Sequence, residues 1–146
     1  MFENSLATLL FVLALAGVSL AGCSRKKPID RDEAQSKIRS ARSFAAESDM
    51  FVDFVLQEHS TRRYREGHSA YLEQAVEQSS REFGQTAPEA DVENSVRECR
   101  SNLGMLAREL SRIRAAVSSG DDDALLAAQA KIRHIRESLE RANSRL

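Results

Sequence analysis

Hydrophobic residues recur at alternating steps of four and three positions through the last third of the chain. The first series is Val92, Val96, Cys99, Leu103, Leu106, Leu110, Ile113 and Val117. The second series is Leu125, Ala128, Ile132, Ile135, Leu139, Ala142 and Leu146. This heptad spacing places each series on one side of a helix and is typical of helices that pack with a small left-handed crossing angle. The pattern therefore predicts two packed helices.

The residues between the two series predict a tight turn. Gly120 is a suitable C-terminal cap for the first helix, and Asp121 is a suitable N-terminal cap for the second. Asp122 and Asp123 follow, and carboxylates stabilise the positive end of a helix dipole. The sequence thus predicts an antiparallel helical hairpin at the C-terminus.

Residues 30–84 carry a less regular pattern that predicts a break. A first stripe comprises Ala34, Ile38, Ala41, Ala45, Ser48, Val52 and Val55, after which His59, Arg62 and Glu66 fall on the same side. A second stripe, out of phase, comprises Tyr64, His68, Tyr71, Leu72, Ala75, Val76 and Phe83. An unbroken helix would measure about 80 Å, against about 47 Å for the helix at 88–118. We therefore expect a turn between Gln57 and Ser69, with Gly67 and Ser69 as candidates for the helix end and the next N-cap.

Two further helix starts are predicted by capping-box spacing, in which a side chain binds the amide three residues on. Asp30 with Glu33 and Thr86 with Glu89 both have this spacing. Six Gly and two Pro are too few for a fold of many short strands. The predicted fold is all-α: an antiparallel bundle of three to four long helices over residues 30–146, with coiled-coil-like heptad packing. The lengths favour four helices over three.

The first 22 residues have the features of a targeting segment. Residues 6–21 contain no charge and number 16, which is signal-peptide length rather than the roughly 20 residues of a spanning helix. The sequence Leu20-Ala21-Gly22-Cys23 that follows resembles the lipobox of bacterial lipoproteins. The resemblance implies cleavage between Gly22 and Cys23 and lipidation of the Cys23 thiol, which anchors the protein in a membrane. An uncleaved short anchor or a buried helix is the alternative.

The lipobox resemblance covers the leader alone and divides the chain into residues 1–22, a basic tether at 23–29 and the bundle. Glu3 departs from the basic start usual in signal peptides. Ser24 follows the cysteine where Asp would imply retention in the inner membrane, so the resemblance implies an outer-membrane lipoprotein facing the periplasm. The basic residues at 25–27 either contact anionic headgroups or form a solvated linker.

Residues 50–56 are apolar almost all the way round a helix, which is more than one core-facing stripe requires. One interpretation is a helix buried on several sides. The other is a docking surface for a partner protein, a second copy or a lipid. The candidate partner-binding residues are Met50, Phe51, Phe54, Val55 and Leu56.

The histidines and Cys99 are the residues of this sequence whose side chains could form a chemical site. His59 and His68 stand nine residues apart, on opposite faces of a helix, so no metal-ligand set and no cofactor is predicted. An alternative function is a small ligand, non-covalent haem or metal bound in an interior cavity lined by His59, Tyr64, His68 and Tyr71. Cys99 lies on the heptad seam and is expected in the core, with a disulfide to another molecule, or to Cys23 if lipidation fails, as alternatives.

Charge and motifs exclude several functions. Glu3 is the one charged residue before position 24, so the chain after cleavage has 21 basic and 21 acidic residues, and no dominant basic face is expected for nucleic acid. Four exposed ion pairs are expected along the helices: Glu93 with Arg97, Arg133 with Glu137, Arg136 with Glu140, and Glu137 with Arg141. Phosphate loops, nucleophile elbows and metal motifs are absent, so no enzyme is predicted. The predicted function is a lipid-anchored, periplasm-facing interaction or accessory module of the bacterial cell envelope, with an envelope protein or a second copy as partner.

Overall fold

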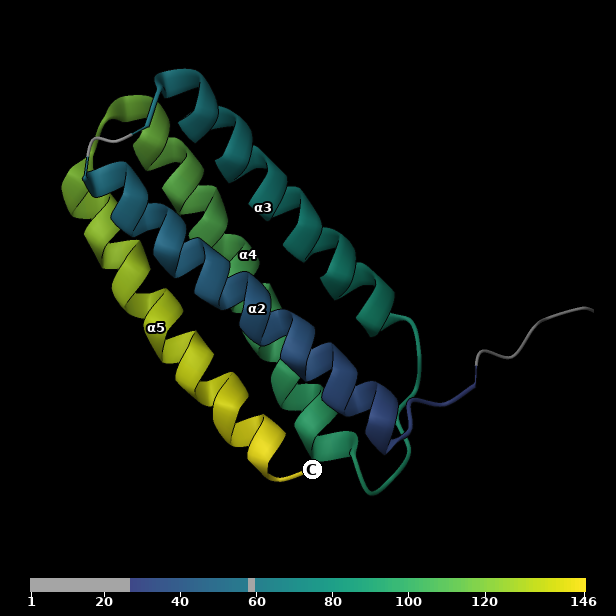
Figure 1. Ribbon diagram of the computed structural model, residues 1–146. Helices are drawn as coiled ribbons and strands as arrows, with labels where there is room; N and C mark the ends of the chain where they lie inside the picture. The colour runs from purple at the N-terminus through teal and green to yellow at the C-terminus, as the bar shows by residue number, and fades with distance from the viewer. Residues whose placement is uncertain (1–26, 58–59) are drawn as a thin grey trace, which may run out of the picture.

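The structure is a computed structural model that describes residues 27–57 and 60–146. Its elements in this part of the chain are α2 (Arg31–Leu56), α3 (Arg62–Gly84), α4 (Glu93–Ser119) and α5 (Asp122–Ser144). Figure 1 shows these helices lying along one common direction, each reversing the direction of the one before it. The predicted antiparallel bundle is confirmed, with four helices rather than three. The signal segment and the lipobox residues Gly22 and Cys23 lie outside the described residues.

The heptad seams of the C-terminal hairpin form the centre of the core. All eight residues of the series from Val92 to Val117 are buried. In the second series Leu125, Ala128, Ile132, Ile135, Leu139 and Ala142 are buried, and Leu146 packs at the edge of the core. α4 and α5 lie side by side along their length, so the predicted hairpin is confirmed.

Three of the predicted helix ends are confirmed by their caps. The Asp30 carboxylate accepts a hydrogen bond from the Glu33 amide at 2.9 Å, and the Asp121 carboxylate accepts one from the Ala124 amide at the same distance. Gly120 has φ of 72°, a left-handed conformation that glycine adopts without steric cost. This conformation lets the chain reverse between α4 and α5 within two residues.

The predicted turn between Gln57 and Ser69 is confirmed, but it lies earlier than Gly67. α2 ends at Leu56, and α3 begins at Arg62 with Thr61 as its N-cap, whose hydroxyl accepts from the Tyr64 amide at 3.3 Å. The prediction of an end at Gly67 and an N-cap at Ser69 was wrong. Both residues lie inside α3, where Ser69 is buried and its hydroxyl donates to the Glu66 carbonyl at 3.1 Å.

The predicted helix start at Thr86 was also wrong, and a contact from a distant segment explains why. α4 begins at Glu93, with Val92 as an N-cap that has no side-chain hydrogen bond. The Glu89 amide, which a capping Thr86 would have bound, donates instead to the Ile29 carbonyl at 2.9 Å. The Ile29 amide donates to the Ala87 carbonyl at 2.9 Å, and Ile29 is buried. The packed part of the chain therefore includes Ile29, which the sequence placed in the tether.

Arg100 of α4 fastens the end of α3 to the bundle. Its guanidinium donates to the Phe83 carbonyl at 2.7 and 3.0 Å and to the Thr86 carbonyl, and it lies 5.3 Å from the centroid of the buried Phe83 ring. Carbonyls at a helix C-terminus otherwise lack partners within the helix. In the described part of the chain, no helix combines the length and apolar composition needed to cross a membrane.

Candidate binding groove between α2 and α3

The apolar segment at 50–56 divides between the core and the surface. Phe51, Val52 and Val55 are buried, Leu56 is partly buried, whereas Met50 is 71% exposed and Phe54 is 39% exposed. α2 packs against α5, α4 and α3, so three of its sides are covered and most of the apolar residues are needed there. Of the proposed partner-binding residues, Phe51 and Val55 therefore belong to the core, and Met50 and Phe54 form the accessible surface.

α3 adds aromatic rings to this surface. Tyr64 stacks on His68 with ring centroids 5.3 Å apart, and Phe54 meets the Tyr64 ring edge-on at 5.7 Å. His68 also contacts Phe51 at 5.0 Å and Tyr71 at 5.8 Å. An edge-on pair of benzene rings such as that of Phe54 and Tyr64 stabilises by about 1 kcal/mol. The rings form a continuous row that joins α2 to α3 near the loop between them.

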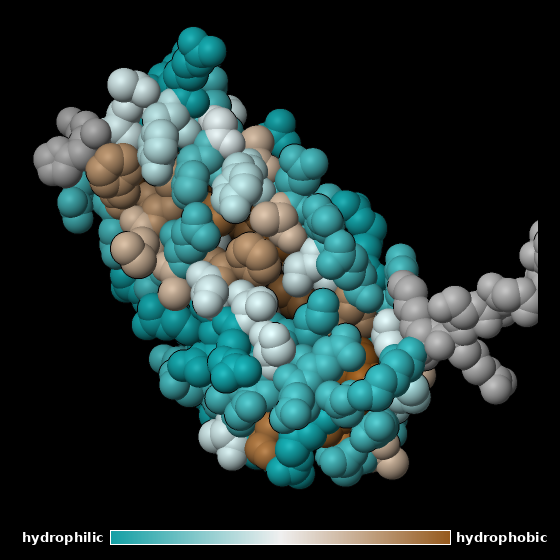
Figure 2. Space-filling model, turned by 45° about the vertical axis from the view of Figure 1, so that its right-hand side comes forward, coloured by the Kyte–Doolittle hydropathy of each residue, from teal (hydrophilic) through white to brown (hydrophobic). Residues whose placement is uncertain are grey.

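The row of rings forms one wall of a groove of about 750 Å³. The residues that line this α2–α3 groove are Ser43, Ala46, Glu47, Met50, Phe51, Asp53, Phe54, Gln57, Tyr64 and His68. In Figure 1, α3 stands apart from α2, with α4 behind the two. Figure 2 shows an apolar area running from beside the grey residues of the α2–α3 connection to the middle of the molecule, with hydrophilic residues on both sides. The groove is therefore an open apolar surface.

The charged side chains of the groove are acidic. Glu47 and Asp53 are 44% and 49% exposed at their side chains, and the lining includes neither Lys nor Arg. The Nε2 atom of His68 lies 3.4 Å from a Glu47 carboxylate oxygen. The groove combines apolar anchors with negative charge at its edge.

The predicted interior cavity was wrong in its position. Tyr64 and Tyr71 are exposed rather than turned into the core, and His68 lies with them on the groove side of α3. His59 falls outside the described residues. Within residues 27–57 and 60–146, no three His, Cys, Asp or Glu side chains come together in a way that could hold a metal ion.

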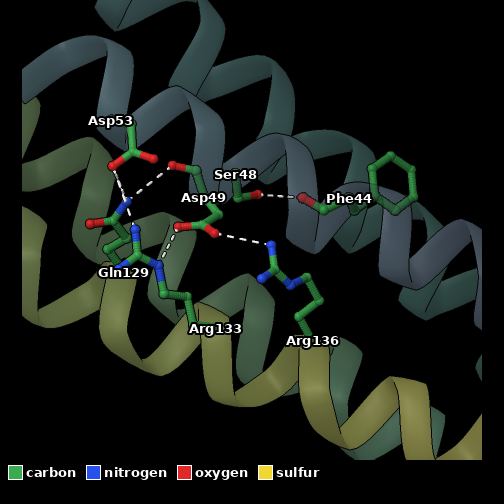
Figure 3. A network of polar contacts seen from close by, with 7 residues as sticks. All are labelled: Phe44, Ser48, Asp49, Asp53, Gln129, Arg133 and Arg136. Atoms are coloured by element: carbon green, nitrogen blue, oxygen red, sulfur yellow. Dashed lines mark hydrogen bonds and ion pairs between the residues drawn. The ribbon is translucent and has the colours of Figure 1, made fainter. Parts of the chain in front are cut away.

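Behind the groove, a polar network joins α2 to α5, and Figure 3 shows its members. The buried Asp49 carboxylate accepts hydrogen bonds from Arg133 at 2.9 Å and from Arg136 at 3.1 Å. The Gln129 side-chain amide donates to the Asp49 carbonyl at 3.2 Å and to the Asp53 carboxylate at 2.6 Å. Asp53 therefore belongs both to this network and to the groove.

The predicted surface pairs of Arg133 and Arg136 with glutamates of their own helix were wrong. Both arginines reach across to Asp49, and Glu140 pairs with Arg42 of α2 at 2.8 Å. Asp49 directly follows the seam residue Ser48 in the sequence. This position next to the core could have predicted that its carboxylate needs partners from a neighbouring helix. Of the other predicted pairs, Glu93 with Arg97 is confirmed at 3.9 Å, while Glu137 lies nearest His134 rather than Arg141, at 3.9 Å.

Cys99 occupies the core position that its place on the seam predicts. Its side chain is fully buried, and burial raises the pKa of the thiol to about 12. A disulfide to another molecule would require the bundle to open around it.

Replacing Asp49 should destabilise the bundle more than replacing an exposed residue of the same interface. In Asp49→Ala, Arg136 loses its carboxylate partner and Arg133 keeps Asp53 alone, at 3.5 Å, so we expect the free energy of unfolding to fall by about 2 kcal/mol. Glu140→Ala, which removes an exposed α2–α5 ion pair, should cost less than about 0.5 kcal/mol. Urea unfolding followed by circular dichroism measures both values. Equal losses in the two variants would contradict a structural role for the network.

Cys99 should not react with thiol reagents in the folded protein. At mildly alkaline pH a thiol with its pKa raised to about 12 stays protonated, and the side chain is shielded from reagent. A Cys23→Ser variant, in which Cys99 is the remaining cysteine, should show one reactive thiol in guanidinium chloride and none under native conditions, measured with Ellman's reagent. Rapid modification of the native protein would show that the α4 seam opens readily.

Comparisons with known proteins identify no relative for this chain. The sequence matches no protein-family model, no curated protein and no solved structure.

Proposed function

We propose that this protein is a lipid-anchored interaction module of the bacterial cell envelope, tethered through Cys23 and binding a partner protein in the α2–α3 groove. The observation that carries the proposal is the apolar surface of the groove, where Met50, Phe54 and Tyr64 are exposed on neighbouring helices. Contiguous exposed apolar surface commonly marks a contact with another molecule. The lipobox supplies the anchor.

The position of the groove supports a partner beyond the membrane surface. The described chain begins at the end of the bundle that also holds the α3–α4 loop and the C-terminus, where Arg31 donates to the Leu146 carbonyl at 2.6 Å. Met50 lies about 30 Å along α2 from the helix start at Asp30, from the rise per residue of a helix. An anchor at Cys23 thus places the groove in the distal half of the bundle. Confinement to a surface raises the effective concentration toward a membrane-bound partner.

An ion pair joins Lys27 to Asp30 at the start of the described chain. The Lys27 ammonium lies 2.6 Å from the Asp30 carboxylate, and their hydrogen bond raises the pKa of Lys27 and lowers the pKa of Asp30. Lys27 is thereby directed to the start of α2. The proposed location is the periplasmic face of the outer membrane. Two features support it: the leader resembles that of bacterial lipoproteins, and Ser24 rather than Asp follows the cysteine.

The chemistry of the groove favours binding over catalysis. His68 and Glu47 lie together, and Ser43 lines the same groove. However, the Ser43 hydroxyl donates to the Arg39 carbonyl of its own helix at 3.1 Å. A nucleophilic serine would instead be engaged by the base that activates it. These side chains are suited to recognition.

A small apolar ligand is the second candidate, and the size of the groove is the observation that favours it. A volume of about 750 Å³ lies within the range of small-molecule sites. Non-covalent haem would use the same groove, with His68 as the iron ligand. Small-molecule sites usually bury most of the ligand surface, which an open groove does less well than an enclosed cavity.

Native mass spectrometry of the full-length protein, extracted gently from its own membranes, distinguishes these possibilities. We expect a chain that begins at acylated Cys23 and carries a protein partner in stoichiometric amount. Met50→Lys should release the partner because it places an ammonium among the apolar contacts, whereas Leu126→Lys, at an exposed site on α5, should retain it.

Other masses would contradict the proposal. A chain that retains Met1 would disprove processing at the lipobox. An acylated monomer with a small molecule bound, and with no protein, would replace the proposed function by the second candidate.

A further inference from the structure

The spacing of residues in the α2–α3 groove indicates the shape of its partner. Of the eight groove residues on α2 and its C-cap, five are separated by alternating steps of four and three, namely Ser43, Glu47, Met50, Phe54 and Gln57, and Ala46, Phe51 and Asp53 lie beside them. This is a second heptad stripe, next to the one that faces the core. α3 continues the spacing with Tyr64, His68 and Tyr71. Two helical rows of this kind form the holes that receive the side chains of another helix.

The length of the groove agrees with a helical partner. From Ser43 to Gln57 the stripe covers about 21 Å along α2, which corresponds to about four helical turns. The accessible anchors Met50 and Phe54 are one turn apart in the middle of the stripe. A helix that presents apolar residues every three to four positions can contact both anchors and the Tyr64 ring.

The charges of the groove select a basic partner. Glu47 has His68 as its ion-pair neighbour and remains partly exposed. Asp53 accepts from Gln129 and lies 3.5 Å from Arg133 through its Oδ1 atom, and within the described residues its Oδ2 atom makes no polar contact. Both carboxylates can accept further hydrogen bonds at the groove edge. Lys or Arg on a partner would complement them.

We infer that the α2–α3 groove binds an amphipathic helix of a partner protein, with apolar side chains packed on Met50 and Phe54 and with Lys or Arg facing Glu47 and Asp53. This inference rests on the proposed function, because it takes the groove as the docking site and names the chemistry of the partner. The bound helix would act as a fifth helix of the bundle.

A second copy of the chain fits the groove less well. In a symmetric dimer the patch on one copy meets the same patch on the other, so each groove would face a second surface that also carries Glu47 and Asp53. The groove lining offers no Lys or Arg, and the Arg133 guanidinium beside Asp53 belongs to the network behind the groove. Membrane lipid is also a poor occupant, because the groove lies in the half of the bundle away from the proposed anchor, and acyl chains do not interact with carboxylates.

Two synthetic helical peptides test the inference directly. Both carry the same stripe of Leu residues at heptad spacing, and one has Lys and the other Glu at the flanking positions. The full-length acylated protein is placed in phosphatidylcholine nanodiscs, with empty nanodiscs as the blank, and binding is measured by fluorescence anisotropy of labelled peptide. The Lys peptide should bind about tenfold or more tightly than the Glu peptide, and added salt should reduce the difference.

Matched variants locate the binding site. Met50→Lys and Glu47→Lys should each weaken the Lys peptide by about tenfold or more, because they remove an anchor and reverse a charge. Leu126→Lys and Glu137→Lys, exposed positions on α5, should leave binding unchanged. Gln57→Glu adds a carboxylate to the stripe and should tighten binding. A cooperative thermal unfolding transition is the control that each variant is folded.

Several outcomes would overturn the inference. Equal binding of the two peptides would show docking without charge selection, and binding of neither peptide would show that the groove does not receive a helix of this kind. A change from dimer to monomer on Met50→Lys would identify a second copy as the occupant. The two peptide results leave the acylation and the partner mass seen by native mass spectrometry unchanged, so failure of the inference and failure of the proposed function are separable.

Discussion

The apolar seam of α4 is the surface on which the rest of the bundle depends, because α2, α3 and α5 all pack against this helix. The eight seam residues in the series from Val92 to Val117 are all buried, and α5 covers them with a seam of the same spacing. Burial of these side chains supplies most of the favourable free energy that an antiparallel hairpin of this length needs. The position of α2 and α3 then depends on the apolar side chains that each of them can bury against α4 and α5.

α3 has the fewest buried residues of the described helices, and this explains the groove. Its buried positions are Ser69, Leu72, Val76 and Phe83, and the last of these is held to α4 by Arg100. α3 is thus attached chiefly to α4, while its contact with α2 depends on the aromatic row around His68. The side between α2 and α3 stays open, and the second heptad stripe of α2 remains uncovered. The uncovered stripe is the physical basis of the proposed docking site.

Much of the fold follows from local rules that the sequence displays directly. Regular heptad steps predicted α4 and α5, and Asp30, Gly120 and Asp121 cap helix ends as their residue types indicate. Contacts between distant segments were not predictable in this way. α4 does not begin near Thr86 as predicted, because the Ile29 backbone forms hydrogen bonds with the loop there. Arg133 and Arg136 do not pair with glutamates of their own helix, because their long side chains reach Asp49 on the neighbouring helix.

The candidate site was predicted only in part, for a related reason. The segment at 50–56 is apolar on almost every face, with Asp53 as its one charged residue, so its periodicity does not reveal which faces other helices cover. Phe51 is buried and Met50 is exposed because α2 packs against three other helices, and this packing cannot be read from the sequence pattern. Likewise Tyr64 and His68 belonged to an irregular stripe, and their position beside Phe54 depends on the loop that ends before Thr61. The two sets of residues proved to line one surface.

Site-specific photo-crosslinking in living cells tests most directly whether this surface is the binding site. A benzophenone-bearing residue replaces Met50 in the full-length chain, and the same residue replaces Leu126 on α5 in a reference variant. The account predicts one dominant adduct with a different protein from position 50, loss of that adduct when Glu47→Lys is added, and no comparable adduct from position 126. Absence of an adduct at position 50, or adducts formed only between copies of this chain, would contradict it.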